Sequence, residues 1–204
     1  MPSRPSVDRR KSDVGSPPAR RPSQGTPSEN RWEIISASVR ETDRLGQAIG
    51  HGLRGGEILA LFGPLGAGKT ALVRGIAKGL GAATTGVSSP TFVLIHEYRG
   101  RLALAHVDLY RIDSLRDLES TGLGEYLSGP TVTVIEWADK GLAWLPDDRL
   151  EIELRHLTVE SRRVRLAARG PVSIPLLLRT KTEFCRSRTT ARRGHPKHRK
   201  AQPI

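Results

Sequence analysis

Apolar positions in residues 31–168 recur with two different periods, which predicts an alternation of strands and helices. Residues 57–62 form a short, mostly apolar stretch that predicts a buried strand. Residues 70–80 then place apolar side chains at helical spacing, and Gly81 marks the end of that helix. Near the start of this region, residues 32–35 predict a first strand.

A further helix is predicted between these two strands, because Ser38 and Glu41 form a capping box. In this pattern the serine side chain accepts from the first helical turn and the glutamate reaches back toward the helix start. The apolar side chains that follow share one helix face; they are Leu45, Ala48, Ile49 and Leu53.

The other strands are predicted mainly as two hairpins. Residues 92–98 and 102–107 are strand-like runs separated by three residues, which is hairpin spacing. Residues 149–157 and 162–168 alternate well enough to predict a closing hairpin.

Two elements remain between the hairpins. Residues 113–127 predict a short helix, and residues 131–135 are a strongly β-prone run. With the preceding elements they predict one compact α/β domain in which a mixed β-sheet is flanked by helices.

Charge is concentrated at the two ends of the chain. The formal net charge is +12, yet residues 31–168 hold 17 basic and 17 acidic side chains. Residues 1–30 hold six basic and three acidic side chains, and residues 169–204 hold ten and one. Both ends are too polar to offset their ordering entropy, so we expect disordered tails around one domain. A chain trimmed to residues 31–168 is then expected to fold.

Composition also restricts the compartment. Cys185 is the one cysteine of the chain, so no intrachain disulfide can form and a reducing compartment fits. No apolar run approaches the ~18 residues that a membrane span needs. Residues 1–30 lack the apolar segment of a secretory signal. We therefore expect a cytoplasmic protein without membrane contact.

Residues 63–70, Gly-Pro-Leu-Gly-Ala-Gly-Lys-Thr, match the phosphate-binding loop pattern G-x-x-x-x-G-K-[ST] between a predicted strand and a predicted helix. The glycines let backbone N–H groups turn toward phosphate, and the helix N-terminus adds its positive dipole end. Lys69 is predicted to reach the β- and γ-phosphates, and the Thr70 hydroxyl to bind magnesium.

Two acidic residues stand at the ends of predicted strands downstream of the loop. Asp108 and Glu136 each follow an apolar run, which is where a phosphate-loop fold places its magnesium-directing carboxylate. Either acid fits that role on the pattern alone. Four histidines show no metal-ligand spacing, which argues against a zinc site; they are His51, His96, His106 and His156.

Five motifs follow one another in a fixed order and spacing. They are Gly63–Thr70, Ser89–Phe92, His106–Arg111, Gly122–Leu127 and Ile135–Trp137. The set resembles the TsaE family, also called YjeE, over about residues 32–168. The resemblance implies a small P-loop ATPase that works with the subunits TsaB and TsaD. Those subunits transfer a threonylcarbamoyl group to an adenosine beside the anticodon of certain tRNAs, and ATP hydrolysis supports their turnover.

The resemblance also implies roles for single residues, with ATP and Mg²⁺ as cofactors. The implied nucleotide contacts of the loop are Gly63, Leu65, Gly66, Ala67, Gly68, Lys69 and Thr70. Thr70 and Glu136 correspond to the family's magnesium pair. Asp108 matches the functional acid of the neighbouring strand, so the implied catalytic residues are Lys69, Asp108 and Glu136.

Three positions outside the loop match further nucleotide contacts of the family. Val39 precedes the first helix, whereas Asp139 and Arg162 lie in a region that aligns loosely. Pro64 replaces the usual acid or amide, and Val107 replaces the usual phenylalanine. Neither replacement removes a side chain that donates to phosphate.

Two other classes of protein compete with this interpretation. One is another P-loop phosphotransferase, such as a kinase or a GTPase. The base-reading motif of GTPases is missing, and the arginines that could form the lid of a kinase are mostly in the tails. The other is a nucleotide-regulated RNA-binding protein whose basic tails contact tRNA, which predicts salt-sensitive RNA binding. The central segment has no obvious arginine finger, so slow hydrolysis without partners is expected.

Overall fold

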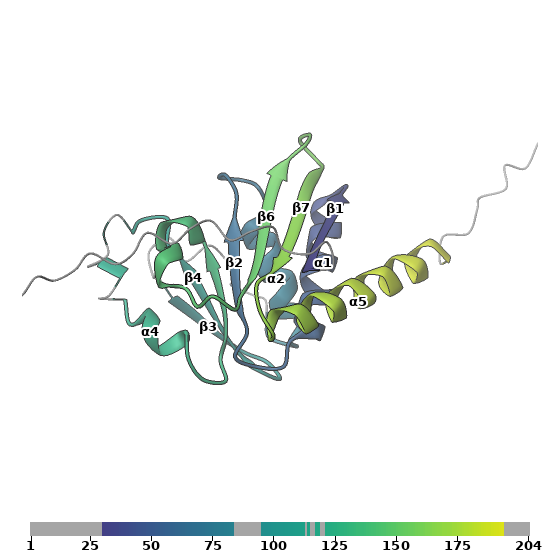
Figure 1. Ribbon diagram of the computed structural model, residues 1–204. Helices are drawn as coiled ribbons and strands as arrows, with labels where there is room; N and C mark the ends of the chain where they lie inside the picture. Colours follow the sequence, from purple (N-terminus) through teal and green to yellow (C-terminus); the bar gives the residue numbers. More distant parts are fainter. Residues whose placement is uncertain (1–29, 84–94, 113, 115–116, 119–120, 194–204) are drawn as a thin grey trace, which may run out of the picture.

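The computed structural model describes residues 30–83, 95–112, 114, 117–118 and 121–193 and shows a mixed sheet flanked by helices (Figure 1). The strand order is β1-β7-β6-β2-β5-β4-β3. The strands are β1 (Arg31–Ser36), β2 (Ile58–Phe62), β3 (Ile95–Arg99), β4 (Ala103–Asp108), β5 (Val132–Glu136), β6 (Leu150–His156) and β7 (Arg162–Ala168). This architecture confirms the fold class that the sequence predicts.

Strand β2 lies at the centre and sets the direction of the inner strands. It pairs in parallel with β5 and with β6, and β4 pairs in parallel with β5. The two predicted hairpins are confirmed as the antiparallel pairs β3–β4 and β6–β7, and β1 closes one edge against β7. The carboxyl ends of β2, β4 and β5 therefore meet at one edge of the sheet, where open α/β sheets bind their ligands.

Alternate side chains of the inner strands enter two separate cores. Leu59 and Leu61 belong to the larger cluster, which α1 (Val39–Gly52), α2 (Lys69–Gly79) and α5 (Ser173–Arg193) cover. Ile58 and Ala60 belong to the smaller cluster on the opposite face, beside α4 (Leu123–Tyr126) and η2 (Ala138–Trp144). Both faces of the inner strands are thus buried, as their unbroken apolar runs require.

Helices α1 and α2 cross with their backbones in contact, which explains the glycines inside them. A Cβ atom on Gly46 would lie 2.3 Å from the Leu72 carbonyl oxygen, and one on Gly75 would lie 2.2 Å from that of Asp43. A mid-helix glycine costs roughly 1 kcal/mol relative to alanine. Here the close crossing offsets that cost and fixes α2, and with it the loop before α2.

The start of α1 follows the predicted capping box. The Ser38 hydroxyl accepts from the Glu41 N–H at 3.2 Å, and the Glu41 carboxylate accepts from the Ala37 N–H at 2.8 Å. The four predicted apolar positions of this helix are all buried. The start of α1 is therefore capped in both directions, as the sequence predicts.

Residues 113–127 differ from the predicted continuous helix. Their described part ends in the single turn α4, and Gly122 before it has a left-handed backbone with φ of 71°. A continuous helix cannot pass through that conformation. Leu118 and Leu123 are nevertheless buried, as predicted. The Ser89–Phe92 motif and residues 1–29 lie outside the described residues.

The prediction that residues 169–204 are disordered is wrong for Ser173–Arg193, which form α5. Leu176, Leu177 and Phe184 of this helix are buried in the larger core. The Phe184 ring meets the Trp32 ring edge-on, with centroids 5.7 Å apart. These apolar side chains share one helix face, and the high Arg and Thr content of the segment hides that periodicity.

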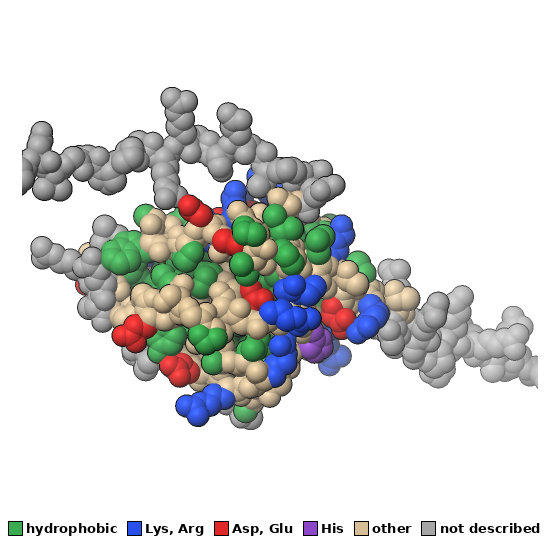
Figure 2. Space-filling model, turned by 60° about the horizontal axis from the view of Figure 1, so that its bottom comes forward, with side chains coloured by type: hydrophobic (Ala, Val, Ile, Leu, Met, Phe, Trp, Pro, Cys, Tyr) green, Lys and Arg blue, Asp and Glu red, His purple; other side chains and the backbone are tan. Residues whose placement is uncertain are grey.

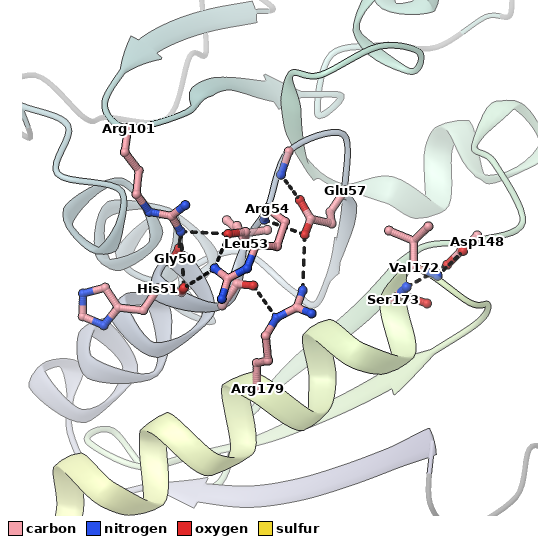
Figure 3. A network of polar contacts seen from close by, with 12 residues as sticks. Gly50, His51, Leu53, Arg54, Glu57, Arg101, Asp148, Val172, Ser173 and Arg179 are labelled. Carbon is pink, nitrogen blue, oxygen red and sulfur yellow. Dashed lines mark hydrogen bonds and ion pairs between the residues drawn. The ribbon is translucent and has the colours of Figure 1, made fainter.

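Helix α5 is anchored at its start by Asp148, whose carboxylate accepts from the N–H groups of Val172 and Ser173 at 2.6 and 3.0 Å (Figure 3). It runs along α1 and remains polar on its outer side. Residues 31–168 alone therefore lack a helix that completes the core of the domain.

Within the described chain, no helix combines the length and apolar character needed to cross a membrane.

We expect Phe184→Ala to lower the free energy of unfolding by about 3–4 kcal/mol, because it removes a fully buried ring and leaves a cavity. Leu178→Ala is the control on the same helix, since Leu178 is 52% exposed, and should cost less than about 1 kcal/mol. Urea unfolding followed by circular dichroism measures both. Equal small effects would show that α5 does not belong to the core.

Candidate nucleotide-binding site

The loop between β2 and α2 has a shape that only glycine permits at key points. Gly63, Gly66 and Gly68 all have positive φ, at 136°, 76° and 101°. A Cβ atom on Gly63 would lie 2.3 Å from the Leu154 carbonyl oxygen. A glycine turn leading into a helix N-terminus presents N–H groups to an anion. Leu65 is exposed and Ala67 is buried. Because neither side chain has a hydrogen-bonding group, each of these predicted residues can offer an anion only its backbone N–H.

The Lys69 side chain folds back into this loop. Its Nζ donates to the carbonyl oxygens of Gly63 at 2.7 Å and Pro64 at 3.0 Å. The same ammonium lies 3.8 Å from the centroid of the Trp137 ring. The charge therefore sits between two carbonyl groups and an aromatic face, without an ion pair among these contacts.

Three predicted acids surround that lysine. Burial lowers the pKa of Lys69 below its usual range, and the carboxylates of Glu136, Asp108 and Asp139 oppose this shift in that order. The side chains that the sequence places 39 to 70 positions downstream thus lie close enough to act on its charge. The structure brings the loop lysine and all three acids to the same edge of the sheet.

Glu136 is the centre of a buried hydrogen-bond chain. Its Oε1 accepts from the Thr70 hydroxyl at 2.9 Å and lies 2.9 Å from Nε2 of His106. Asp108 is the register partner of Glu136 on the adjacent strand, and its carboxylate accepts from the Tyr110 N–H at 2.9 Å. Among the described residues no three His, Cys, Asp or Glu side chains form a metal cluster. A Mg²⁺ site needs fewer protein ligands than such a cluster, since one or two carboxylates suffice when phosphates complete the coordination.

Arg162 reaches the site from the start of β7. It is 4% exposed, its Nη1 donates to the Thr42 hydroxyl at 3.2 Å, and its buried Nε has no partner within the described residues. A Cβ atom on Gly68 would lie 3.5 Å from that Nε. Val39 begins α1 one turn before Thr42 and is exposed. A glycine cradle, a buried cation and an unsatisfied N–H donor beside it fit a bound anion.

Three residues of this site have no assigned role in the sequence interpretation. His106 holds Glu136 from the strand next to it, and Thr42 holds Arg162. Trp137 covers Lys69 and has a left-handed backbone, with φ of 58°, which is rare for a residue with a side chain. The placement of His106 two residues before Asp108, on the same strand face, is the one signal that the sequence contains.

Four features of this site define the class of phosphate-loop proteins. They are a parallel core strand, a glycine loop, a helix beginning in Lys-Thr and an acid at the end of the adjacent strand. The family model of the threonylcarbamoyl adenosine biosynthesis protein TsaE matches residues 36–164. The chain belongs to this family, as the five sequence motifs indicate.

Individual relatives agree with the family model. The tRNA threonylcarbamoyladenosine biosynthesis protein TsaE of Treponema pallidum is 41% identical over 133 residues, which are 65% of this chain and 98% of that protein. The protein of the same name from Bacillus subtilis is 37% identical over 141 residues, or 69% and 86% of the two chains. The crystal structure of Bacillus subtilis YdiB is similar with a TM-score of 0.63 and 30% identity, covering 74% of this chain and 95% of that one.

Proposed function

We propose that this protein binds and hydrolyses ATP with Mg²⁺ as a subunit of tRNA threonylcarbamoyladenosine biosynthesis. The observation that carries the proposal is the site around Lys69, in which a glycine loop faces the paired Thr70 and Glu136. Family membership supports the pathway, because the relatives are named for it. tRNA modification favours a cytoplasmic location.

In this proposal each polar side chain of the site has a separate task. The loop N–H groups and Lys69 hold the β- and γ-phosphates. Thr70 and Glu136 form the metal side, and Mg²⁺ when bound neutralises phosphate charge there. Asp108 orients the attacking water from the adjacent strand, where it is the register partner of Glu136.

Three further positions complete the proposed nucleotide site. The unsatisfied Nε of Arg162 is directed to a phosphate oxygen beside Gly68. Val39 and Asp139 flank the nucleotide, from the start of α1 and from η2. His106 keeps the Glu136 carboxylate in one orientation.

We further propose that the partners are TsaB and TsaD, and that they dock around the mouth of the site. Leu65 at the loop tip is 77% exposed, and Val159 at the tip of the β6–β7 hairpin is 94% exposed. The loop lies next to the end of β6 that leads into this hairpin tip, since a Cβ atom on Gly66 would lie 3.8 Å from Nε2 of His156. Exposed apolar side chains around a functional site are typical of a protein interface.

The competing classes have less support. The relatives are named for threonylcarbamoyladenosine biosynthesis and not as kinases, GTPases or RNA-binding proteins. RNA binding through two disordered tails also loses part of its basis, because Ser173–Arg193 form an ordered helix. RNA contact remains compatible with the proposal when it accompanies the ATPase.

The direct test is reconstitution of tRNA modification. TsaB, TsaD, a threonylcarbamoyl donor and unmodified tRNA are combined with and without this protein, and modified adenosine is counted by mass spectrometry. Several turnovers per complex are expected only when the protein and ATP with Mg²⁺ are both present. Equal turnover without the protein would reject the proposed role.

A second test separates the two acids. Glu136→Gln should raise the Mg²⁺ concentration needed for tight nucleotide binding by about tenfold, because it removes a metal-side carboxylate. Asp108→Asn should instead lower the hydrolysis rate by roughly 10²-fold with little change in Mg²⁺ dependence. Magnesium titrations of nucleotide affinity and steady-state rates measure both. The opposite pattern would exchange the two roles.

A further inference from the structure

Three arginine side chains from different parts of the chain converge on the last turn of α1 (Figure 3). Arg101 comes from the β3–β4 turn, Arg179 from α5, and Arg54 from the segment before β2. They donate to main-chain oxygens of residues 50–53: Nη2 of Arg101 at 2.6 Å, Nε of Arg179 at 2.6 Å and Nη1 of Arg54 at 3.0 Å. The three positive charges therefore share one small region of the surface.

The negative charge at this point is smaller. Glu57 pairs with Arg179 at 3.5 Å and already accepts from the N–H groups of Arg54 and Gly55, both at 2.7 Å. Glu183 of α5 brings a second carboxylate, which lies 3.5 Å from Nδ1 of His51. The end of α1 adds roughly half an elementary negative charge. Burial lowers the pKa of Arg179, and the nearby Arg54 lowers it further, against the effect of Glu57. Positive charge thus remains in excess.

Part of this excess charge faces solvent. The carbonyl groups engage one nitrogen each of Arg54 and Arg101, and both residues are exposed. Arg186 is 76% exposed, lies two turns after Arg179 on the same side of α5, and forms an ion pair with Glu183 at 2.8 Å. Figure 2, which brings the lower side of Figure 1 forward, shows Lys and Arg side chains gathered beside a histidine.

We propose that these four arginines, Arg54, Arg101, Arg179 and Arg186, form a basic surface that binds the phosphate backbone of RNA. The proposal rests on the proposed function, in which the substrate of the pathway is a tRNA. Planar guanidinium groups with several N–H donors suit phosphate oxygens. The family model ends at residue 164, so α5 adds two of the four arginines outside the matched region.

The basic surface and the ATP site can be filled together. Arg54 and Glu57 stand just before β2, whereas the phosphate loop follows its last residue, Phe62. The two sites therefore lie at opposite ends of the central strand.

The experiment measures binding of the full chain to a fluorescent, unmodified tRNA transcript by anisotropy over a range of salt concentrations. Arg54→Glu and Arg186→Glu should each weaken binding by about tenfold and reduce the salt slope by about one or more. Lys181→Glu is the matched control: it reverses an exposed charge on the same helix, about 200° around the axis from Arg179. This control should change affinity by less than about twofold.

Several outcomes would overturn the proposal. They are absence of tRNA binding by the unmodified protein near 0.15 M salt, unchanged binding in both arginine variants, and equal losses in Arg186→Glu and Lys181→Glu. ATP affinity is measured on the same samples. Lys69→Ala should lose ATP binding and keep tRNA binding, so failure of the ATPase proposal and failure of the RNA proposal give different results.

Discussion

Lys69→Ala is expected to weaken ATP binding by about 3 kcal/mol, or about a hundredfold, and to abolish hydrolysis. The proposed contacts are charge-assisted hydrogen bonds to the β- and γ-phosphates, and removing such a donor costs roughly 1.5–3 kcal/mol for each bond. The loss falls more heavily on hydrolysis than on binding, because negative charge shifts toward the bridging oxygen as the γ-phosphate leaves.

The fold should survive this substitution. Lys69 contributes two hydrogen bonds to loop carbonyls, at Gly63 and Pro64, and its ammonium lies over the Trp137 ring. Lys69→Met retains the stem while removing the charge, so it separates packing from phosphate binding. Lys78→Ala is the matched control on the same helix, since Lys78 forms an exposed ion pair with Asp43 at 2.8 Å.

Three measurements test this prediction together. Isothermal titration gives the ATP affinity, steady-state assays give the hydrolysis rate, and circular dichroism reports whether the protein is folded. Both Lys69 variants should lose affinity and rate while keeping the helical signal, and Lys78→Ala should resemble the unmodified protein. Unchanged ATP affinity in folded Lys69→Ala would show that the loop is not the phosphate site.

The sequence predicts the fold and loop well because their signals are local. A phosphate loop needs glycine at fixed spacing for its backbone geometry, and a buried parallel strand needs an apolar run. The pairing of Thr70 with Glu136 follows once the resemblance is accepted, and the structure places the two side chains in contact. The roles of these residues stay predictions until the variants are measured.

What the sequence did not predict depends on contacts between distant segments. Phe184 packs on Trp32, 152 positions away, and an average over an Arg-rich segment gives no sign of that burial. Arg162 reaches Thr42 over 120 positions. The left-handed backbone of Trp137 is imposed by its surroundings, because its own side chain disfavours that conformation.

TsaB and TsaD together are expected to accelerate ATP hydrolysis by this protein by at least about tenfold, and by up to roughly 10³-fold if they supply a missing cation. Transfer of the γ-phosphate requires charge stabilisation and a positioned water. Arg162 is a cation of the domain itself, and it lies beside Gly68 at the start of α2. It is 4% exposed, however, and its guanidinium donates to the Thr42 hydroxyl. A partner bound over the exposed tips can complete the site from the open side.

The interface can be tested separately from the chemistry. Val159→Asp places a charge at the 94% exposed hairpin tip and should remove most of the acceleration, while ATP affinity and the rate without partners stay the same. Leu178→Asp is the control, because it adds the same charge at a 52% exposed position on α5. Steady-state rates at fixed magnesium and salt, with increasing TsaB–TsaD, give both the maximal rate and the partner affinity. Fast hydrolysis that partners do not change would establish a self-sufficient ATPase, because the domain would then supply all the charge stabilisation that the γ-phosphate needs.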